Sequence, residues 1–356
     1  MMNALERRST FALSSIFALR MLGLFMIIPV FSVAGQSYQY ATPALIGLAV
    51  GVYGLTQAIL QIPFSLIADR YSRKPLVVFG LLLFALGGAI AAMSDTIYGV
   101  IIGRAIAGGG AVSAVVMALL ADVTREENRM KAMAVMGMSI GMSFVVAFSL
   151  GPWLTGWVGI SGLFWVTTVM GLAAILMLLL VPKVTRHHRN FQQGYITQLK
   201  QVLKMGDLNR LHVSVFTLHL LLTAMFIYVP SQLIQFADIP LQHHGWVYLP
   251  LLLVSLFVAF PSIVLAEKYR KMRGIFLTAI AGIILGLLVL IFGFESKYIL
   301  LLGLGLFFIA FNVMEALLPS WLSKAAPIQS KATAMGVNAS SQFLGAFFGG
   351  MIGGQL

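Results

Sequence analysis

Eleven long apolar runs fill most of this chain, and short connectors rich in lysine and arginine separate them. A helix that crosses a bilayer needs about 20 mostly apolar residues, and each run approaches that length. The runs cover residues 11–34, 44–67, 75–93, 97–121, 131–156, 161–182, 211–236, 246–266, 274–293, 298–322 and 332–354. Of all residues, 60% are hydrophobic and 10% are charged, whereas soluble domains average about 25% charged residues. The sequence therefore predicts an all-α membrane protein.

The positive charge of the chain lies on one side of the predicted membrane. A net charge of +12 can indicate a nucleic-acid partner, but these charges sit in short connectors between apolar runs. With a cytoplasmic N-terminus, all but three of the 23 lysines and arginines fall in cytoplasmic segments. The exceptions are Lys297 on the outer side and Arg20 and Arg104 inside runs. Lysine and arginine in loops set orientation, so we expect a cytoplasmic N-terminus and no nucleic-acid partner.

The connector after the second run is repeated later in the chain. Residues 68–71 read Ala-Asp-Arg-Tyr, and residues 266–269, which lie 198 positions later, read Ala-Glu-Lys-Tyr. Residues 118–120 and 316–318 both read Ala-Leu-Leu at the same offset. The pattern predicts two related halves.

The halves divide the chain into two bundles and a linker. We expect residues 1–182 to form an N-terminal bundle of six helices and residues 211–356 to form a C-terminal bundle with helices seven to eleven. Because a six-plus-six arrangement needs one more helix, we expect a truncated sequence that lacks helix twelve. In the linker, residues 183–210, Leu199 and Val202 belong to a helically spaced apolar set. This spacing predicts a short amphipathic helix on the cytoplasmic membrane surface.

Residues 65–74, Ser-Leu-Ile-Ala-Asp-Arg-Tyr-Ser-Arg-Lys, resemble the connector motif of the major facilitator superfamily, with serine at both motif glycines. Residues 19–23, 53–58 and 311–320 resemble the YajR-type group of bacterial proton-driven exporters. The resemblance implies two pseudo-symmetric six-helix bundles in a bacterial inner membrane. It also implies alternating access driven by a proton gradient, without a bound cofactor. We expect a monomer that carries a small-molecule substrate.

The resemblance also implies a gate at the connectors. Arg73 is expected to pair with Asp122, and Asp69 to face the N-terminus of the eleventh helix, where the helix dipole is positive. These contacts would join the halves while the cavity opens outward. The remaining gating residues are the motif cations and the acid of the second copy, which are Arg70, Lys74 and Glu267.

Two ionisable residues inside apolar runs are candidates for proton coupling. An ionisable group within a membrane span is costly, so it is a functional candidate by default. Glu315 lies in the tenth run, where apolar neighbours favour a neutral carboxyl. Arg20 lies near the middle of the first run. It could pair with Glu315, form a static ion pair elsewhere or contact an anionic substrate; the residue pattern leaves these open.

Other residues are candidates for lining the substrate cavity. Arg104 either reaches this cavity or extends to the membrane interface. The other candidates are polar or adaptable side chains, namely Tyr53, Gln57, Gln61, Met26 and Asn312. Glycines four apart, Gly137 with Gly141 and residues 345, 349 and 353, are expected to let helices approach closely.

The motifs present favour a transporter over an enzyme or an ATP-driven pump. No cysteine, His-Glu-x-x-His or Gly-x-Ser-x-Gly motif, or phosphate-binding loop occurs, and we expect no metal site. The predicted function is proton-coupled efflux of a small amphipathic compound. The alternative is proton-coupled import of a sugar or an organic anion, and a receptor or channel is a further alternative that the duplicated halves disfavour.

Overall fold

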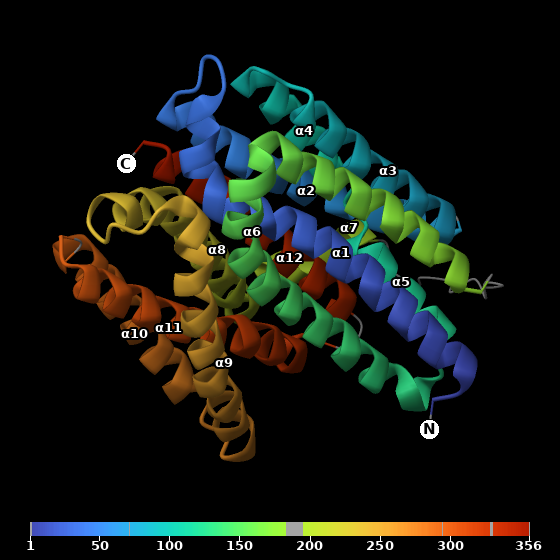
Figure 1. Cartoon of the computed structure of the whole chain (residues 1–356). Helices are drawn as coiled ribbons and strands as arrows, with labels where there is room; N and C mark the ends of the chain where they lie inside the picture. Colours follow the sequence, from blue (N-terminus) through green and yellow to red (C-terminus); the bar gives the residue numbers. More distant parts are fainter. Residues whose placement is uncertain (1, 71, 183–194, 294, 328–329, 356) are drawn as a thin grey trace.

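The computed structural model describes residues 2–70, 72–182, 195–293, 295–327 and 330–355, without the side chains of residues 69, 70, 195, 196, 267 and 332. This part of the chain is helical almost throughout (Figure 1). The α-helices are α1 (Ala4–Ala34), α2 (Pro43–Arg70), α3 (Arg73–Ala92), α4 (Ile97–Gly109), α5 (Ser113–Val123), α6 (Glu126–Met177), α7 (Tyr195–Lys204), α8 (Gly206–Gln235), α9 (His244–Lys268), α10 (Met272–Gly293), α11 (Lys297–Ala325) and α12 (Lys331–Gly353). Short 3-10 turns are η1 (Gly35–Ser37), η2 (Leu178–Leu180) and η3 (Leu241–His243).

The helices correspond to the eleven predicted runs. Among the described residues, nine helical segments are long and apolar enough to cross a membrane. One of them, Glu126–Leu180, contains two predicted runs, because α6 breaks at Gly159. Gly159 has φ 68°, a left-handed backbone conformation that glycine tolerates best. Figure 1 shows the two parts of α6 turning back on each other there. The eleventh run corresponds to α12. This helix is not among the nine segments, because its hydropathy is lower than theirs.

The fourth run differs from its prediction, since it is two helices instead of one. Residues 110–112 separate α4 from α5. Three consecutive glycines precede the break, and glycine weakens a helix interior. A Cβ at Gly110 would overlap the carbonyl oxygen of Gly80 on α3, so the glycine also permits close packing. The break places Ser113 at the first turn of α5, facing the protein interior.

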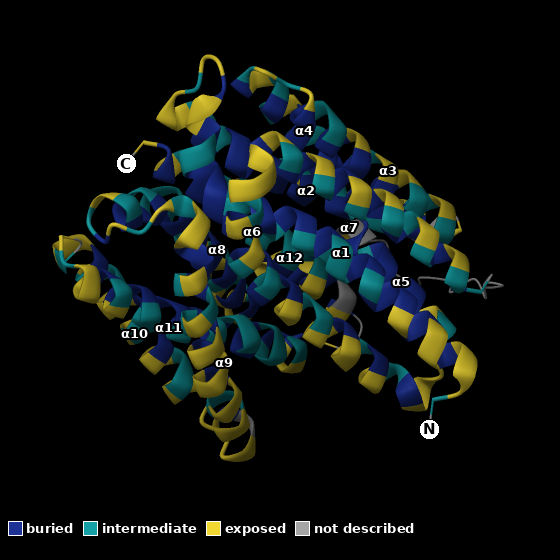
Figure 2. Ribbon diagram, in the orientation of Figure 1, coloured by how far each residue is buried: buried dark blue, intermediate teal, exposed yellow. Residues whose placement is uncertain are grey.

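The two halves of the chain meet along α1, α2 and α6 on one side and α8, α9 and α12 on the other. We refer to α1–α6 as the N-half and to α8–α12 as the C-half. Helix α12 packs against α8 of its own half and against α2 of the N-half. Helix α9 packs against the first part of α6. The buried residues, dark blue in Figure 2, form two clusters. One lies inside the N-half, and the other continues across both halves.

The linker helix α7 covers the range that its spacing predicted, but it packs against the protein. Val202 is fully buried, and Gln198 Oε1 accepts a hydrogen bond of 3.0 Å from Thr333 Oγ1 on α12. The side chain of Leu203 on the same helix is exposed. The contacts of helix α7 therefore connect it to α8 and α12 of the C-half.

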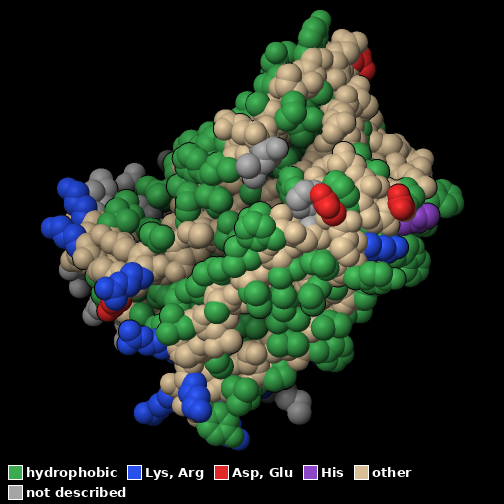
Figure 3. All heavy atoms as spheres, turned by 90° about the vertical axis from the view of Figure 1, so that its left-hand side faces the viewer, with side chains coloured by type: hydrophobic (Ala, Val, Ile, Leu, Met, Phe, Trp, Pro, Cys, Tyr) green, Lys and Arg blue, Asp and Glu red, His purple; other side chains and the backbone are tan. Residues whose placement is uncertain are grey.

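One face of the molecule shows how charge is distributed over the surface. In Figure 3, hydrophobic side chains spread over most of the visible face, and lysine and arginine gather at its lower and left edges. The few acidic side chains in that view lie mainly toward the other edge. This distribution resembles the surface of a protein embedded in a bilayer with one basic side.

Candidate transport site between the two halves

The interface between the halves is tightly closed at one end. There, the start of α2 lies along the end of α12, and a Cβ at Gly51 would come 2.7 Å from the carbonyl oxygen of Phe347. A Cβ at Gly245, in the first turn of α9, would overlap the carbonyl oxygen of Ser149 on α6. Only glycine allows the backbones to approach this closely. We call this the closed end.

The opposite end of the interface is open. Gly137 and Gly141 on α6 have no heavy atom within 4 Å of the position that a Cβ would occupy, and the same holds for Gly336 on α12. The prediction that Gly137 and Gly141 mediate close packing is therefore wrong for this conformation, because α6 and α9 diverge here (Figure 1). The matching prediction for α12 is confirmed, since its glycines at 345, 349 and 353 all lie against the α8 backbone.

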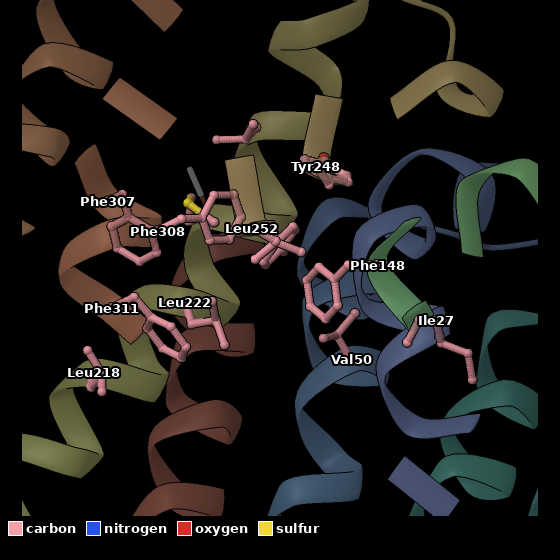
Figure 4. Packing of buried hydrophobic residues seen from close by; sticks show 14 of the residues in the cluster. Ile27, Val50, Phe148, Leu218, Leu222, Tyr248, Leu252, Phe307, Phe308 and Phe311 are labelled. Atoms are coloured by element: carbon pink, nitrogen blue, oxygen red, sulfur yellow. The ribbon is translucent and has the colours of Figure 1, made fainter. Parts of the chain in front are cut away.

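A layer of aromatic residues separates the two ends. Phe148 on α6 contacts Phe226 on α8, with ring centroids 4.4 Å apart at 66°. One turn away, Phe144 stacks on Phe311 of α11 with ring centroids 6.1 Å apart. Tyr248 on α9 extends the layer, 5.5 Å from Phe226. Figure 4 shows part of this packing. The layer joins N-half and C-half and forms a floor beneath the open end.

Glu315 lies on the open side of this floor. It follows Phe311 by four residues on α11, so the two side chains share a helix face. The corresponding face of α6 carries Phe144 and then Gly141 and Gly137, three and seven residues earlier. No atom packs over these glycines, and the Glu315 side chain retains 39% of its exposure. An acidic group within a predicted membrane span thus borders the opening.

His219 and Gln342 complete a polar cluster around Glu315. His219 Nε2 on α8 lies 3.5 Å from Glu315 Oε2 and 2.7 Å from the carboxamide nitrogen of Gln342 on α12. His219 Nδ1 lies 3.1 Å from the carbonyl oxygen of Val215. The imidazole also contacts the Phe311 ring edge-to-face at 5.8 Å. The cluster therefore brings together α8, α11 and α12.

The hydrogen-bond partners determine where neutral His219 carries its proton. A backbone carbonyl can only accept, so Nδ1–H donates to Val215. An amide nitrogen can only donate, so Nε2 accepts from Gln342. In that tautomer, Nε2 accepts from Gln342 and lies 3.5 Å from Glu315 Oε2. One added proton has two adjacent positions here, the imidazole Nε2 and the Glu315 carboxylate.

Arg20 is bound inside the N-half, away from Glu315. Its guanidinium donates to Ser113 Oγ at 2.6 Å, to Tyr53 Oη at 2.9 Å and to Gln57 Oε1. The residue is 2% exposed. The possible pair between Arg20 and Glu315 is therefore not formed, because neutral oxygens of α2 and α5 surround the guanidinium instead.

Arg104 is also buried and does not extend to the membrane surface. It is 3% exposed and donates to the backbone carbonyls of Ala49 and Val50 on α2. Its guanidinium lies 5.7 Å from the centre of the Tyr53 ring. Residues of α1, α2, α3, α4 and α6 surround a cavity of about 10 Å³ beside Tyr53 and Arg104, which is near the minimum for one water molecule.

The remaining cavity candidates do not line an open space in this conformation. Gln57, Gln61 and Met26 are 0%, 3% and 1% exposed. Asn312 is partly exposed and donates to Ser255 Oγ on α9 at 2.8 Å. The structure thus separates the predicted set into a buried N-half group and a C-half group next to the opening.

The connector residues fall partly within the described structure. Arg73 and Asp122 form the ion pair that the resemblance implied, and Arg73 also donates to the carbonyl of Ala118 at 2.7 Å. Lys74 donates to the carbonyl of Val181, which ties α3 to the end of the sixth span. The side chains of three further predicted gating residues, Asp69, Arg70 and Glu267, lie outside the described part.

A second polar contact near the open end was not predicted. Glu6 accepts hydrogen bonds from the backbone nitrogen, Nε and Nη2 of Arg125, and from Asn128 Nδ2 at 3.0 Å. Glu6 also closes a capping box with Asn3 at the start of α1. These contacts fasten the N-terminus of α1 to the turn between α5 and α6.

Sequence reasoning missed His219 and Gln342, although a signal was present. His212 and His219 are seven residues apart in the seventh run, so they occupy one helix face. Asn338 and Gln342 are four apart in the eleventh run and also share a face. The rule applied to Glu315 and Arg20, that ionisable groups inside spans mark functional sites, would have selected His219 as well.

Known proteins resemble the chain over nearly its whole length. The Major Facilitator Superfamily profile matches residues 13–350. The inner membrane transport protein YajR of Escherichia coli strain K12 is 46% identical over 353 residues, which cover 99% of this chain and 78% of that protein. Multidrug resistance protein 1 of Bacillus subtilis strain 168 is 25% identical over 98% of this chain and 89% of its own length.

A solved structure shows the same fold. A bacterial homologue of the human lysosomal transporter Spinster, in an inward-facing and unoccupied conformation, superposes with a TM-score of 0.81 at 16% identity. The match covers 99% of this chain and 82% of that chain. The helical architecture, the spans and the family match together show that this chain is a multi-pass membrane transporter of the major facilitator superfamily, and not an enzyme.

Proposed function

We propose that this secondary transporter exports a small amphipathic compound in exchange for protons. The observation that carries the proposal is the Glu315 carboxylate at the opening, 3.5 Å from His219. A carboxyl that can be neutral or charged can couple proton movement to a conformational change. Acidic and histidine side chains inside membrane spans are the usual components of proton relays.

Alternating access follows from the two ends of the interface. The connectors near the open end carry most of the lysines and arginines, including Arg73, Arg125 and Lys131. Since basic loops favour the cytoplasmic side, we assign the open end to the cytoplasm of a bacterial inner membrane. The conformation is then inward-facing. In the outward-facing state, Asp69, Arg70, Lys74 and Glu267 would hold the cytoplasmic end closed. The ion pair between Arg73 and Asp122 lies within the N-half and is already formed in the open structure, so it would position this connector.

The surface of the opening supports an amphipathic substrate. Phe144 and Phe311 form its floor, and α6, which carries Phe144, also exposes Met138 and Met142. Methionine and aromatic side chains adapt to apolar ligands of different shape. The polar edge is Glu315, which favours a substrate with a positive or hydrogen-bond-donating group. The B. subtilis relative is named a multidrug resistance protein, which agrees with this class.

Import of an organic anion is a second candidate, favoured by one observation. Arg20 and Arg104 are buried guanidiniums whose described hydrogen bonds all go to neutral oxygens. A buried cation without a carboxylate partner is costly. An anionic substrate that reached Arg20 in another conformation would offset that cost.

The test uses the purified full-length chain, reconstituted as a monomer in proteoliposomes with an imposed pH gradient. Ethidium is the cationic probe, and gluconate is the anionic one. We expect ethidium movement against its gradient, driven by the pH gradient, and its loss in Glu315→Gln. The control is Asp207→Asn, whose carboxylate is 88% exposed. Proton-driven gluconate uptake without ethidium movement would favour the second candidate, and unchanged coupling in Glu315→Gln would contradict the assigned proton site.

A further inference from the structure

We infer that an amphipathic cation reaches Glu315 from the cytoplasmic leaflet of the membrane, through a lateral portal between α6 and α9. The portal is the space between Gly137 and Gly141 on α6 and Leu256 and Phe260 on α9. The inference deepens the proposed function and rests on it, since it assumes that the exported compound is a cation that binds beside Glu315. It adds the route of entry, and it narrows the substrate to compounds that partition into the bilayer.

Contacts between helices show which parts of α6 and α9 lie level with Glu315. Phe144 on α6 stacks on Phe311 of α11, with ring centroids 6.1 Å apart. Asn312 of α11 donates to Ser255 Oγ on α9 at 2.8 Å. Glu315 follows these two α11 residues by about one turn, toward the open end. The turns of α6 and α9 that lie next to Phe144 and Ser255 on the open side are therefore level with the carboxylate.

The two helices leave the portal unfilled at this level. Among the described residues, no heavy atom lies within 4 Å of a Cβ placed on Gly137 or Gly141. On α9, Leu256 follows Gly245 by eleven residues, or about three turns, so it continues the helix face that contacts α6 at the closed end. Leu256 and Phe260 are 39% and 72% exposed. An uncovered glycine face and an uncovered apolar face therefore border the same space.

The seam between α2 and α12 is closed at the same level. Gln342 on α12 lies level with the carboxylate, because His219 contacts both groups, at 2.7 Å and 3.5 Å. The next residue, Phe343, has its backbone carbonyl against Gly54 of α2. Nearer the open end, Ser340 Oγ donates to a backbone carbonyl of α2 at 3.4 Å. The opening at this level is therefore one-sided, and it is directed between α6 and α9.

The portal lies within the hydrocarbon of the cytoplasmic leaflet. Gly141 is ten residues from Lys131, or about 15 Å along α6, and Phe260 is eight residues from Lys268, or about 12 Å along α9. One leaflet contributes about 15 Å of hydrocarbon. An apolar hollow of about 370 Å³ on α9 is lined by Leu253, Leu256, Phe257, Phe260 and Pro261. An apolar group that moves in the leaflet can therefore enter the space in front of Glu315 without passing through water.

The aqueous mouth of the opening carries charge of the wrong sign for a cation. The helices that border it each have an exposed lysine at or near the cytoplasmic end, which are Lys131 of α6, Lys268 of α9, Lys324 of α11 and Lys331 of α12. The acids Glu6, Asp122 and Glu127 at this end are ion-paired with arginine. Like charges repel an approaching cation and lower its rate of entry, whereas anionic headgroups concentrate it at the membrane surface. The portal and the mouth thus favour the same occupant, a cation with an apolar body that arrives from the lipid.

The test measures how fast such a cation exchanges with the site. The probe is trimethylammonium-diphenylhexatriene, a rod-shaped fluorescent cation that stays in the bilayer, and the full-length chain is held in phosphatidylcholine nanodiscs. Energy transfer from tryptophan to the bound probe gives the association rate, and displacement by excess tetraphenylphosphonium gives the dissociation rate. A barrier on the entry route changes both rates equally and leaves the affinity unchanged, whereas a change at the binding site alters the affinity.

Bulk in the portal should slow this exchange. Gly141→Phe should lower both rates by about tenfold or more and change the affinity by less than about threefold. The matched control is Gly336→Phe on α12, where the added side chain also meets open space but next to the closed seam. Its rates should stay within about twofold of the parent's. Phe260→Ala widens the portal and should raise both rates by about threefold, so it decides the question if Gly141→Phe does not fold.

Salt provides a second measurement, on the unmodified chain. Entry through the portal should give an association rate that changes by less than about twofold between about 0.05 M and about 0.5 M KCl, because no like charge lies on the route. Entry through the basic mouth should give a rate that rises with salt, because screening weakens the repulsion. A rate that rises severalfold, or equal slowing by Gly141→Phe and Gly336→Phe, would overturn the portal.

Failure of the portal can be told apart from failure of the proposed function. Glu315→Gln should weaken the affinity by about tenfold or more, mainly through faster dissociation. If it does so while Gly141→Phe and Phe260→Ala exchange the probe at the parent's rates, the portal alone is wrong. If the affinity of Glu315→Gln is unchanged, or the parent shows no saturable binding, the cation site of the proposed function is wrong and the inference fails with it.

Discussion

The two ends of the interface between the halves are built from different chemistry. At the closed end, Gly51 and Gly245 bring backbones together without interlocking side chains. At the open end, Gly137 and Gly141 face no packed atom, and the nearest groups are the polar side chains of Glu315 and its partners. Two backbones that meet at glycines can separate without displacing interlocked side chains. An ionisable side chain, in contrast, can gain or lose a proton. The comparison teaches how one interface can be both tight and reversible.

The largest effect should come from bulk at the closed end. In Gly245→Val, the added side chain overlaps the carbonyl of Ser149, which should cost the closed end about 1–3 kcal/mol. The conformational population should therefore shift away from the structure described here. The matched control is Gly141→Val, where the same side chain meets open space. Labelling of single cysteines at both ends measures the shift; equal behaviour of the two variants would remove the distinction between the ends.

An effect of similar size, without preference for either end, is expected from the Arg20 cluster. Arg20→Met leaves the buried oxygens of Ser113, Tyr53 and Gln57 without their donor, at a cost of about 1–3 kcal/mol. Because these partners all belong to the N-half, the variant should lower the melting temperature in detergent but leave accessibility at both ends unchanged. Arg20→Lys should recover only part of the loss, since an ammonium lacks the planar fork. A changed ratio of accessibilities would show instead that the cluster takes part in switching.

The pH dependence of transport should require His219 but not His212, the other buried histidine of α8. His219→Asn removes the proton position beside Glu315 and should abolish most of the pH dependence of ethidium transport. His212→Asn changes a buried histidine on the same face of α8 and should retain the parent's pH profile. Transport rates between about pH 5 and about pH 9 provide the readout. Equal loss in both variants would argue for a general effect on α8.

The smallest effect is expected at the connector. Asp122→Asn breaks the ion pair with Arg73, both of whose side chains are partly exposed. Such pairs contribute about 0.2–1 kcal/mol, so accessibility of the open end should change by less than about fivefold. The accessibility of the open end should depend less on salt concentration in the variant than in the parent. A large shift would mean that the connector, more than the glycines, sets which end is closed.

The spans were predictable because about 20 apolar residues have few alternatives to a membrane helix. The reversal at Gly159 falls between the predicted runs 131–156 and 161–182, whereas the break before Ser113 was not predicted, since it depends on local backbone geometry at glycines. Glycine spacing correctly predicted contacts of α12 but not the exposed Gly137 and Gly141. The same glycine spacing occurs at a tightly packed contact and on an open helix face. The position of the facing helix determines which of the two forms.

The site was partly predictable for a similar reason. Glu315 was selected because a carboxylate inside a span is rare. Its partner could not be deduced from charge alone, which favoured Arg20 on a distant helix. The structure shows that neutral oxygens surround Arg20, whereas His219 reaches Glu315 from α8. Which polar groups meet is determined by the rotation and depth of each helix, and the residue pattern of a single helix does not give these relative to its neighbours.

The most direct test of the account is a pair of distances measured by electron–electron double resonance between spin labels on introduced cysteines. One pair, Met138→Cys with Phe260→Cys, spans the open end on α6 and α9. The other, Ser37→Cys with His243→Cys, spans the closed end. Lowering the pH should shorten the first distance and lengthen the second, and Glu315→Gln should prevent both changes. Distances that change in the same direction, or that ignore pH, would contradict proton-driven alternating access.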